Sequence, residues 1–226
     1  MTLQGLIAAF RRQANDKAQP YFWSDEEVTD YLNAAQVEAA IRGRLILEVA
    51  DVDMCRIPVL PDVDVYTLNP LVYELDHIAF IAAGSTARTP LSLVSTLVLD
   101  ELCNGESWRE RKGEPKYAVQ ADKWVRLVPT PEVAGTIVIE AYRLPKTMVL
   151  ADQVTEMPEI SPAHHEHLID WALHKAFSVP DTEAFDPKRA DESERDFTDY
   201  FGIRPDSDLR RITRQDVQHR VEAFWV

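Results

Sequence analysis

The chain has 226 residues and a formal net charge of −14 at pH 7, with 46% hydrophobic and 27% charged residues. This composition is typical of a soluble globular protein with room for one large or two small domains. A chain this acidic repels a phosphate backbone, which argues against nucleic-acid binding through many basic contacts but allows DNA to pass nearby.

The cysteines and the apolar runs bear on where the protein works. Cys55 and Cys103 lack the spacing of a metal site, so we expect buried, reduced thiols of a cytosolic protein. The first residues carry no charged region before their short apolar patch, and no apolar run reaches membrane-spanning length. We therefore expect neither a signal peptide nor a transmembrane helix.

Two helices are predicted near the N-terminus. Apolar residues at helical spacing over positions 3–10 predict a short amphipathic helix that ends near Asn15 and packs on the next one. The clearest helix of the chain lies between Pro20 and Val49. Ser24 is placed as its N-cap with Glu27 completing a capping box, and Trp23 before the cap forms a hydrophobic staple with Val28. One apolar face of this helix consists of Val28, Tyr31, Leu32, Ala35 and Ala39.

The same helix carries a second apolar line, made of Ala34, Val37, Ile41 and Leu45. A helix that is apolar on two sides packs between layers of its own fold, or between its fold and another subunit. Both alternatives stay open at this point. If the second one holds, these four residues are the subunit-packing residues.

A block of short strands follows the second helix. Beta-branched and aromatic runs separated by turn residues predict strands at residues 55–59, 65–68, 72–82, 117–120, 124–128 and 136–143. Residues 90–102 are ambiguous: they begin as a strand and then allow a short helix capped by Ser95, before a turn at Asn104 and Gly105. We expect antiparallel pairing because the links are too short for parallel crossovers.

Helix signals return after the strands. Ser161 and Pro162 predict the start of a helix that runs to about Phe177, and Asp186 and Pro187 start a second that ends near Gly202. The order of elements predicts an α+β fold in which N- and C-terminal helices form a helical bundle with an inserted antiparallel β-domain, plus an extended C-terminal arm. The expected limits are 1–50 and 151–202 for the helical parts, 51–150 for the β-domain and 203–226 for the arm.

No catalytic or cofactor motif is recognisable, and we expect no cofactor and no metal. The competing hypothesis is a metal-dependent hydrolase that uses the stripe of His164, His167 and His174. The adjacent apolar face favours packing or solvent-facing histidines instead, with His165 packed on that face.

Three other groups of residues in the sequence are candidate sites. Asp76 and His77 are neighbours on a strand and point to opposite faces, which speaks against a catalytic dyad. A module that recognises glycans or peptides through Trp108, Tyr117 and Trp124 is a third hypothesis, although these aromatics fit a core better. The acidic run over residues 181–199 is interpreted as a solvated helix face, with Phe197, Tyr200 and Phe201 on the buried side.

The last stretch of the sequence alternates apolar residues with arginines and finishes on three apolar residues. This pattern predicts a docking arm for an acidic partner surface with an apolar centre; the alternative is that the arm folds back on its own core. The predicted partner-binding residues are Leu209, Arg210, Arg211, Ile212, Arg214, Val217, Val221, Phe224, Trp225 and Val226.

The chain resembles the head-to-tail adaptor, or connector, proteins of tailed bacteriophages, particularly those of short-tailed phages. The resemblance extends to Gly202 and rests on structural motifs, none of them catalytic. They are Phe22–Glu26, Tyr31–Gln36 with Ala39 and Ala40, Trp108 with Gly113–Pro115, Leu127–Pro131, Tyr142–Pro145 and the helix His167–Phe177.

The resemblance implies a structural virion protein and no enzyme. Such adaptors form a homo-oligomeric ring, typically of twelve copies, beneath the portal protein at the portal vertex, after synthesis in the host cytoplasm. The ring extends the DNA channel, through which DNA passes without specific binding, and offers a platform to tail proteins of the nozzle or fiber; no membrane is involved. The portal contact is expected of the C-terminal arm.

Overall fold

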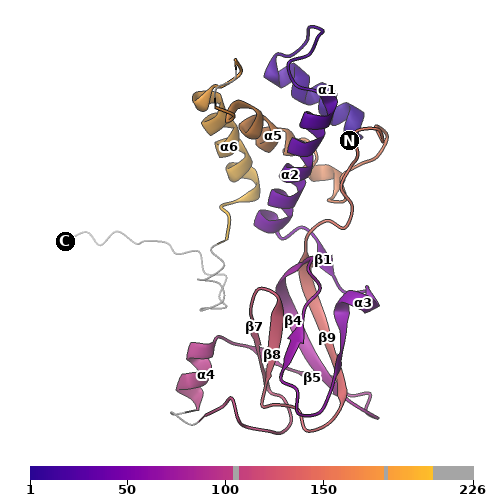
Figure 1. Cartoon of the computed structure of the whole chain (residues 1–226), viewed down its shortest axis with the longest axis vertical. Helices are drawn as coiled ribbons and strands as arrows, with labels where there is room; N and C mark the ends of the chain where they lie inside the picture. The colour runs from indigo at the N-terminus through magenta and orange to yellow at the C-terminus, as the bar shows by residue number, and fades with distance from the viewer. Residues whose placement is uncertain (104–106, 181–182, 206–226) are drawn as a thin grey trace, which may run out of the picture. The chain divides into compact units, whose positions relative to one another are not determined.

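The structure, a computed structural model, describes residues 1–103, 107–180 and 183–205 (Figure 1). These residues form two compact units. The helical unit consists of Met1–Glu48, Leu71–Tyr73 and Tyr142–Pro205, and the β unit contains Val49–Pro70 and Glu74–Ala141. Helices at both ends of the sequence with strands between them confirm the predicted α+β fold.

The two N-terminal helices, α1 (Leu3–Ala14) and α2 (Asp25–Gly43), begin as their sequences predict. The backbone N–H of Glu27 donates to Ser24 Oγ at 3.1 Å, and the Ser24 N–H donates to Glu27 Oε2 at 2.8 Å, which completes the capping box. The α1 helix ends at Asn15, whose left-handed conformation (φ 63°) lets its N–H reach the Arg11 carbonyl.

The α2 helix ends earlier than its apolar pattern suggested. Arg44 adopts a left-handed conformation (φ 50°), its N–H donates to the Ala40 carbonyl, and the short strand β1 (Leu47–Glu48) follows. Leu45 is therefore not on the helix, and its half-buried side chain packs against the core of the helical unit. Gly43 is the last helical residue, and a Cβ atom there would lie 2.7 Å from Leu45 Cδ2, so glycine leaves room for the chain to turn back at Arg44.

The C-terminal helices of this unit are α5 (Leu168–Phe177) and α6 (Pro187–Phe201). Asp186 Oδ1 accepts the Arg189 N–H at 3.2 Å, so the predicted cap of α6 is confirmed. The predicted start of α5 at Ser161 is wrong. Ser161 makes no capping hydrogen bond, and only a 3₁₀ turn, η1 (Pro162–His164), follows it.

The core of the helical unit lies between the inner face of α2 and α1, α5 and α6. Trp23 is 6% exposed and meets the rings of Phe10 and Phe177 edge-on, at centroid distances of 5.5 and 5.7 Å. The predicted inner face of α2 is confirmed, since Val28, Leu32, Ala35 and Ala39 belong to this core. Tyr200 of α6 is 44% exposed, so the expectation that it lies on the buried side is wrong.

The strands form two sheets. The first has the order β1-β9-β4-β5 with β2 also paired to β9, and the second has the order β3-β8-β7-β6. The strand limits are Arg56–Val59 (β2), Val65–Thr67 (β3), Val72–Ala82 (β4), Thr89–Pro90 (β5), Ser92–Leu93 (β6), Tyr117–Gln120 (β7), Trp124–Val128 (β8) and Gly135–Arg143 (β9). The six predicted strands correspond to β2, β3, β4, β7, β8 and β9 and lie close to their predicted limits, whereas the two-residue strands β1 and β5 were not anticipated.

Pairing in the second sheet is not wholly antiparallel. β3 and β7 are antiparallel to β8, but β6 runs parallel to β7, with Ser92 beside Tyr117. The expectation failed because the chain between Leu93 and Tyr117 is long enough for a parallel crossover and includes the helix α4 (Thr96–Leu102), capped by Ser95 as predicted. A second short helix, α3 (Val52–Cys55), was not anticipated; the Asp51 carboxylate caps it.

Gly135 marks a close approach between strands. A Cβ atom at this position would clash with the Ile81 carbonyl oxygen and the Phe80 ring. Only glycine therefore fits where β9 begins beside β4.

Candidate interaction surface on the second helix

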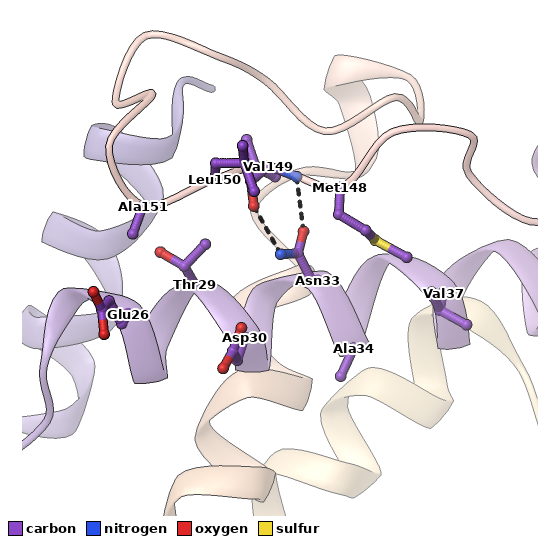
Figure 2. Close-up of a pocket in the computed structure, with 10 residues that line it drawn as sticks. All are labelled: Glu26, Thr29, Asp30, Asn33, Ala34, Val37, Met148, Val149, Leu150 and Ala151. Carbon is purple, nitrogen blue, oxygen red and sulfur yellow. Dashed lines mark hydrogen bonds between the residues drawn. The ribbon is translucent and has the colours of Figure 1, made fainter.

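The outer face of α2 borders a shallow groove of about 550 Å³ (Figure 2). One wall is the helix itself, and the other is the segment Met148–Ala151, which we call the strap. The residues that line this α2 groove are Glu26, Thr29, Asp30, Asn33, Ala34, Val37, Met148, Val149, Leu150 and Ala151.

Asn33 holds the strap against α2. Its side-chain Nδ2 donates to the Val149 carbonyl at 2.8 Å, and the Val149 N–H donates to Asn33 Oδ1 at 3.0 Å. Figure 2 shows both bonds closing between the helix and the strap. The amide thereby satisfies the strap backbone as a neighbouring strand would, which gives the groove a fixed wall.

The groove is apolar with acidic residues at one end. Met148 and Leu150 are 43% and 53% exposed, and the half-buried Ala34 and Val37 face the same space. Glu26 and Asp30 are exposed, and none of the ten lining residues is basic. An exposed apolar surface bordered by charge of one sign is typical of a site for another polypeptide.

Two of the four predicted subunit-packing residues, Ala34 and Val37, line the groove. Ile41 is half-buried one turn further along α2, whereas Leu45 packs on the core after the helix has ended. Sequence reasoning missed the strap, because Met148 and Leu150 lie in a segment without secondary structure more than 100 residues from α2. Asn33 was the available signal, because a half-buried side-chain amide needs hydrogen-bond partners.

The three histidines of the hydrolase hypothesis have separate partners. His164 Nδ1 lies 3.1 Å from the Tyr200 hydroxyl, the His167 ring stacks on Tyr200 at 3.5 Å, and His174 Nδ1 lies 3.0 Å from the Ala190 carbonyl. In the described part of the chain, no three His, Cys, Asp or Glu side chains are placed to hold a metal ion. The geometry gives the hydrolase hypothesis no support.

His165 is fully buried, and its packing differs from that of its neighbours. Its Nε2 lies 2.9 Å from the Ile160 carbonyl and its Nδ1 lies 3.1 Å from the Met1 carbonyl. The ring thus links the start of α1 to the turn before α5 within the helical unit. His165 is therefore buried, and both of its ring nitrogens lie against backbone carbonyl groups.

A second, smaller hollow lies between α5 and α6 and is lined by His167, Asp170, Asp196, Asp199 and Tyr200. Burial raises the pKa of the Asp170 carboxyl above its ordinary value, and the charges of Asp196 and Glu166 add to this. His167, whose Nδ1 lies 3.4 Å from Asp170 Oδ2, acts in the opposite direction. The net effect is a carboxyl group that ionises less readily in the folded protein.

Arg143 is the centre of a buried ion cluster in the helical unit. It is 7% exposed, and it contacts Glu48 Oε2 at 2.9 Å and Glu159 Oε1 at 2.5 Å. Burial alone would raise the pKa of Glu159, but hydrogen bonds from Arg143 and from the backbone of Lys146 outweigh it and hold that pKa below its ordinary value. The cluster ties β1 and the end of β9 to the segment that precedes η1.

The remaining candidates do not form a site. Asp76 and His77 are both exposed on β4. Trp108 is 2% exposed, donates from Nε1 to Asp100 Oδ1 at 2.6 Å and shares a small core with the half-buried Tyr117, whereas Trp124 is 36% exposed. Two of the three aromatics of the glycan hypothesis are thus core residues of the β unit.

The described residues end at Pro205. All ten predicted partner-binding residues of the arm therefore lie outside them. The predicted turn at Asn104 and Gly105 falls outside them as well. Among the residues that the structure describes, no helix is long and apolar enough to cross a bilayer.

Comparison with known protein families places the chain in a phage protein family. A family model described as SU10 adaptor protein matches residues 1–221. The match extends well past Gly202, where the resemblance seen in the sequence stopped, and includes most of the predicted arm. No curated protein matches the chain.

Proposed function

The chain belongs to the SU10 adaptor protein family, a family of phage head-to-tail adaptors, and from this premise we propose that it forms a ring beneath the portal. A ring, typically of twelve copies, extends the DNA channel at the head–tail interface and offers a platform to tail proteins of the nozzle or fiber. As a structural adaptor of a phage, the protein is a virion component. The family match over residues 1–221 is the observation that carries this proposal.

The charge of the chain supports a role as a conduit. With a formal net charge of −14, the protein repels DNA phosphates, so a genome moves past such a wall without binding to it. The outer face of α6 adds to this charge, since Asp191, Glu192, Asp196 and Asp199 are all exposed there.

The α2 groove supports a subunit contact. A closed ring joins two different surfaces of each copy, so an uncovered apolar surface such as this one needs a partner on the neighbouring copy. Ala34, Val37 and Ile41 on the outer face of α2 are the residues that we assign to this contact. Leu45 is the weakest member of the predicted set, because it packs on its own core.

The C-terminal arm is the part that we assign to the portal. Its apolar residues, and Phe224, Trp225 and Val226 above all, gain most from leaving water when they enter a pocket on another protein. The β unit then remains for contacts with tail proteins.

Electron microscopy of the purified protein, alone and mixed with portal rings, tests the proposal. We expect a second ring stacked on the portal. A protein that stays monomeric and ignores every component of the portal vertex, or that turns over a small molecule, would contradict the adaptor function.

Deletion of residues 209–226 tests the role of the arm. We expect the shortened chain to lose co-sedimentation with portal rings, because its apolar anchors are gone. The matched control is Trp124→Ala, which removes an exposed aromatic from β8 and leaves the arm intact. Unchanged co-sedimentation of the shortened chain would remove the arm as the portal anchor.

A further inference from the structure

The α2 groove has features that restrict what can occupy it. Its apolar part consists of Ala34, Val37, Met148 and Leu150, and its charged part of Glu26 and Asp30. A matching partner therefore combines aliphatic side chains with positive charge.

The chain contains one segment with this combination. Residues 209–221 hold Leu209, Ile212, Val217 and Val221, separated by three to five positions, with Arg210, Arg211, Arg214 and Arg220 between them. Four arginines and one aspartate (Asp216) give this segment a formal charge of +3 within a chain of −14. The family match includes all of residues 209–221 and ends before Phe224.

We propose that the α2 groove of one copy binds residues 209–221 of a neighbouring copy. This inference rests on the proposed ring, and it divides the arm into two parts with different partners. The basic part clasps the next adaptor subunit, and the aromatic residues 224–226 remain for the portal.

The course of the chain is compatible with this exchange. Arg204 Nη1 lies 3.5 Å from Glu38 Oε2, so the chain leaves the helical unit beside α2. The 16 residues from 206 to 221 span up to about 55 Å when extended, which sets the reach of the basic segment away from its own helical unit. The groove's charges also match in spacing: Glu26 and Asp30 are four positions apart, as are Arg210 and Arg214.

The two kinds of contact serve different purposes. Exposed ion pairs add little affinity each, but they set the orientation of the segment and exclude acidic partners. The affinity comes from covering Met148 and Leu150, which are about half exposed in the single copy. Val37 and Ala34 complete the apolar floor on the side of α2.

Photo-crosslinking with isotope mixing tests the proposal directly. The full chain is prepared with photo-methionine, which places a reactive group of similar size at each of the four methionines, and only crosslinked peptides that contain Met148 are scored. Copies of natural isotope content and ¹⁵N-labelled copies are mixed, with and without portal rings, irradiated, digested and analysed by mass spectrometry. We expect Met148 to be joined to peptides from residues 209–221, in products that combine the two isotopes.

Charge reversal supplies the matched variants. Glu26→Arg with Asp30→Arg is expected to lower the yield of this crosslink about tenfold, the effect of losing two exposed ion pairs and adding repulsion. Adding Arg210→Glu and Arg214→Glu to the same chain is expected to restore it. Asp191→Arg on the exposed face of α6 is the control and is expected to leave the yield unchanged.

Three results would overturn the inference. In the first, every Met148 crosslink joins peptides of the same isotope, so it lies within one copy. In the second, Met148 is joined only to parts of the chain other than residues 209–221. In the third, charge reversal at Glu26 and Asp30 leaves the crosslink yield unchanged. Imaging of the same samples separates the two proposals. Stacked rings without the Met148 crosslink refute the clasp and leave the adaptor function, whereas a crosslink without rings on the portal refutes the adaptor function.

Discussion

The helical unit and the β unit treat charge differently. In the helical unit, guanidinium groups are buried with their partners: Arg11, 7% exposed, lies 2.7 Å from Asp16, and Arg143 binds Glu48 and Glu159. The Arg42 side chain is 6% exposed and contacts Glu38 of its own helix at 2.8 Å and Thr198 of α6 at 2.9 Å. The contacts of Arg42 with Thr198 and of Arg143 with Glu48 join segments that are far apart in the sequence.

In the β unit, the described ion pairs lie nearer the surface. The side chains of Arg109 and Asp100 are about half exposed, and those of Arg126 and Asp64 about a third. Close packing matters more in this unit, and the tight approach of Gly135 to Ile81 and Phe80 is an example. The comparison teaches that removing a charge should damage the helical unit, and changing a volume should damage the β unit.

Arg143→Met gives the largest expected effect. It leaves Glu159 without its cation and Glu48 with Lys146 alone, whose Nζ lies 3.1 Å from Glu48 Oε2, and breaking a buried pair from one side costs about 3 kcal/mol. Hydrogen exchange, read peptide by peptide, should show lost protection in the helical unit. The control is Arg126→Met in the β unit, where a less buried pair is expected to be worth less than about 1 kcal/mol. Equal losses of stability in the two variants would contradict the view that ion pairs stabilise the helical unit more than the β unit.

Gly135→Ala tests the other side of the comparison. The new Cβ forces β9 away from Ile81 and Phe80, and overpacking of this kind costs about 2 kcal/mol. Urea unfolding combined with hydrogen exchange should place the loss in the β unit. Gly84→Ala is not a suitable control, because its φ of +78° adds backbone strain; Ala82→Gly at the end of β4 changes the same sheet without adding volume.

The sequence was a good guide wherever a local interaction decides the structure. The Ser24–Glu27 capping box, the Asp186 cap and the Ser95 cap each depend on residues within three positions, and all three are present. The inner face of α2 follows from helical periodicity in the same way. The strand limits also follow from period-two patterns and turn residues.

Features that depend on distant residues were not visible in the sequence. The parallel pairing of β6 with β7 depends on where the long connection returns, and the strap depends on Asn33 meeting Val149 across 116 positions. The α2 groove could therefore be predicted only from its helix side, through Ala34 and Val37. The His167–Tyr200 stack is another such contact, and it explains why Tyr200 stays exposed on α6.

Ser24→Ala tests the helical unit with a substitution that removes no charge. Loss of the N-cap of α2 is expected to cost about 1 kcal/mol, because the Glu27 N–H loses its acceptor at 3.1 Å and Glu27 Oε2 loses the Ser24 hydroxyl that donates to it at 2.9 Å. Ser95→Ala removes the cap of α4 in the β unit, where only the Val98 N–H bond at 3.3 Å is lost. Chemical denaturation should therefore show the larger loss for Ser24→Ala, and the reverse order would mean that α4 supports the β unit more than its seven residues suggest.

The smallest predicted effect concerns two carboxyl groups of the helical unit with opposite pKa shifts. Burial raises the pKa of Asp170, so its ionised form is disfavoured by folding. Asp170→Asn is therefore expected to stabilise the protein at neutral pH, by less than Ser24→Ala destabilises it. This gain should decrease as the pH falls through the raised pKa and vanish below 3.8, the ordinary value, where the carboxyl is neutral in both states.

Glu159→Gln is the control for this prediction, and its sign is opposite. The pKa of Glu159 lies below its ordinary value of 4.5, so its contribution to stability is present above that value and is lost as the pH falls through the lowered pKa. Glu159→Gln should therefore destabilise the protein at neutral pH and converge with the wild type in acid. The differences in unfolding free energy between wild type and variant, followed from pH 3 to pH 7, report on these two carboxyls together with the charged groups that contact them. If Glu159→Gln stabilised the protein at neutral pH, as Asp170→Asn is expected to do, the Arg143 cluster would not hold Glu159 ionised. Buried charge would then not stabilise the helical unit.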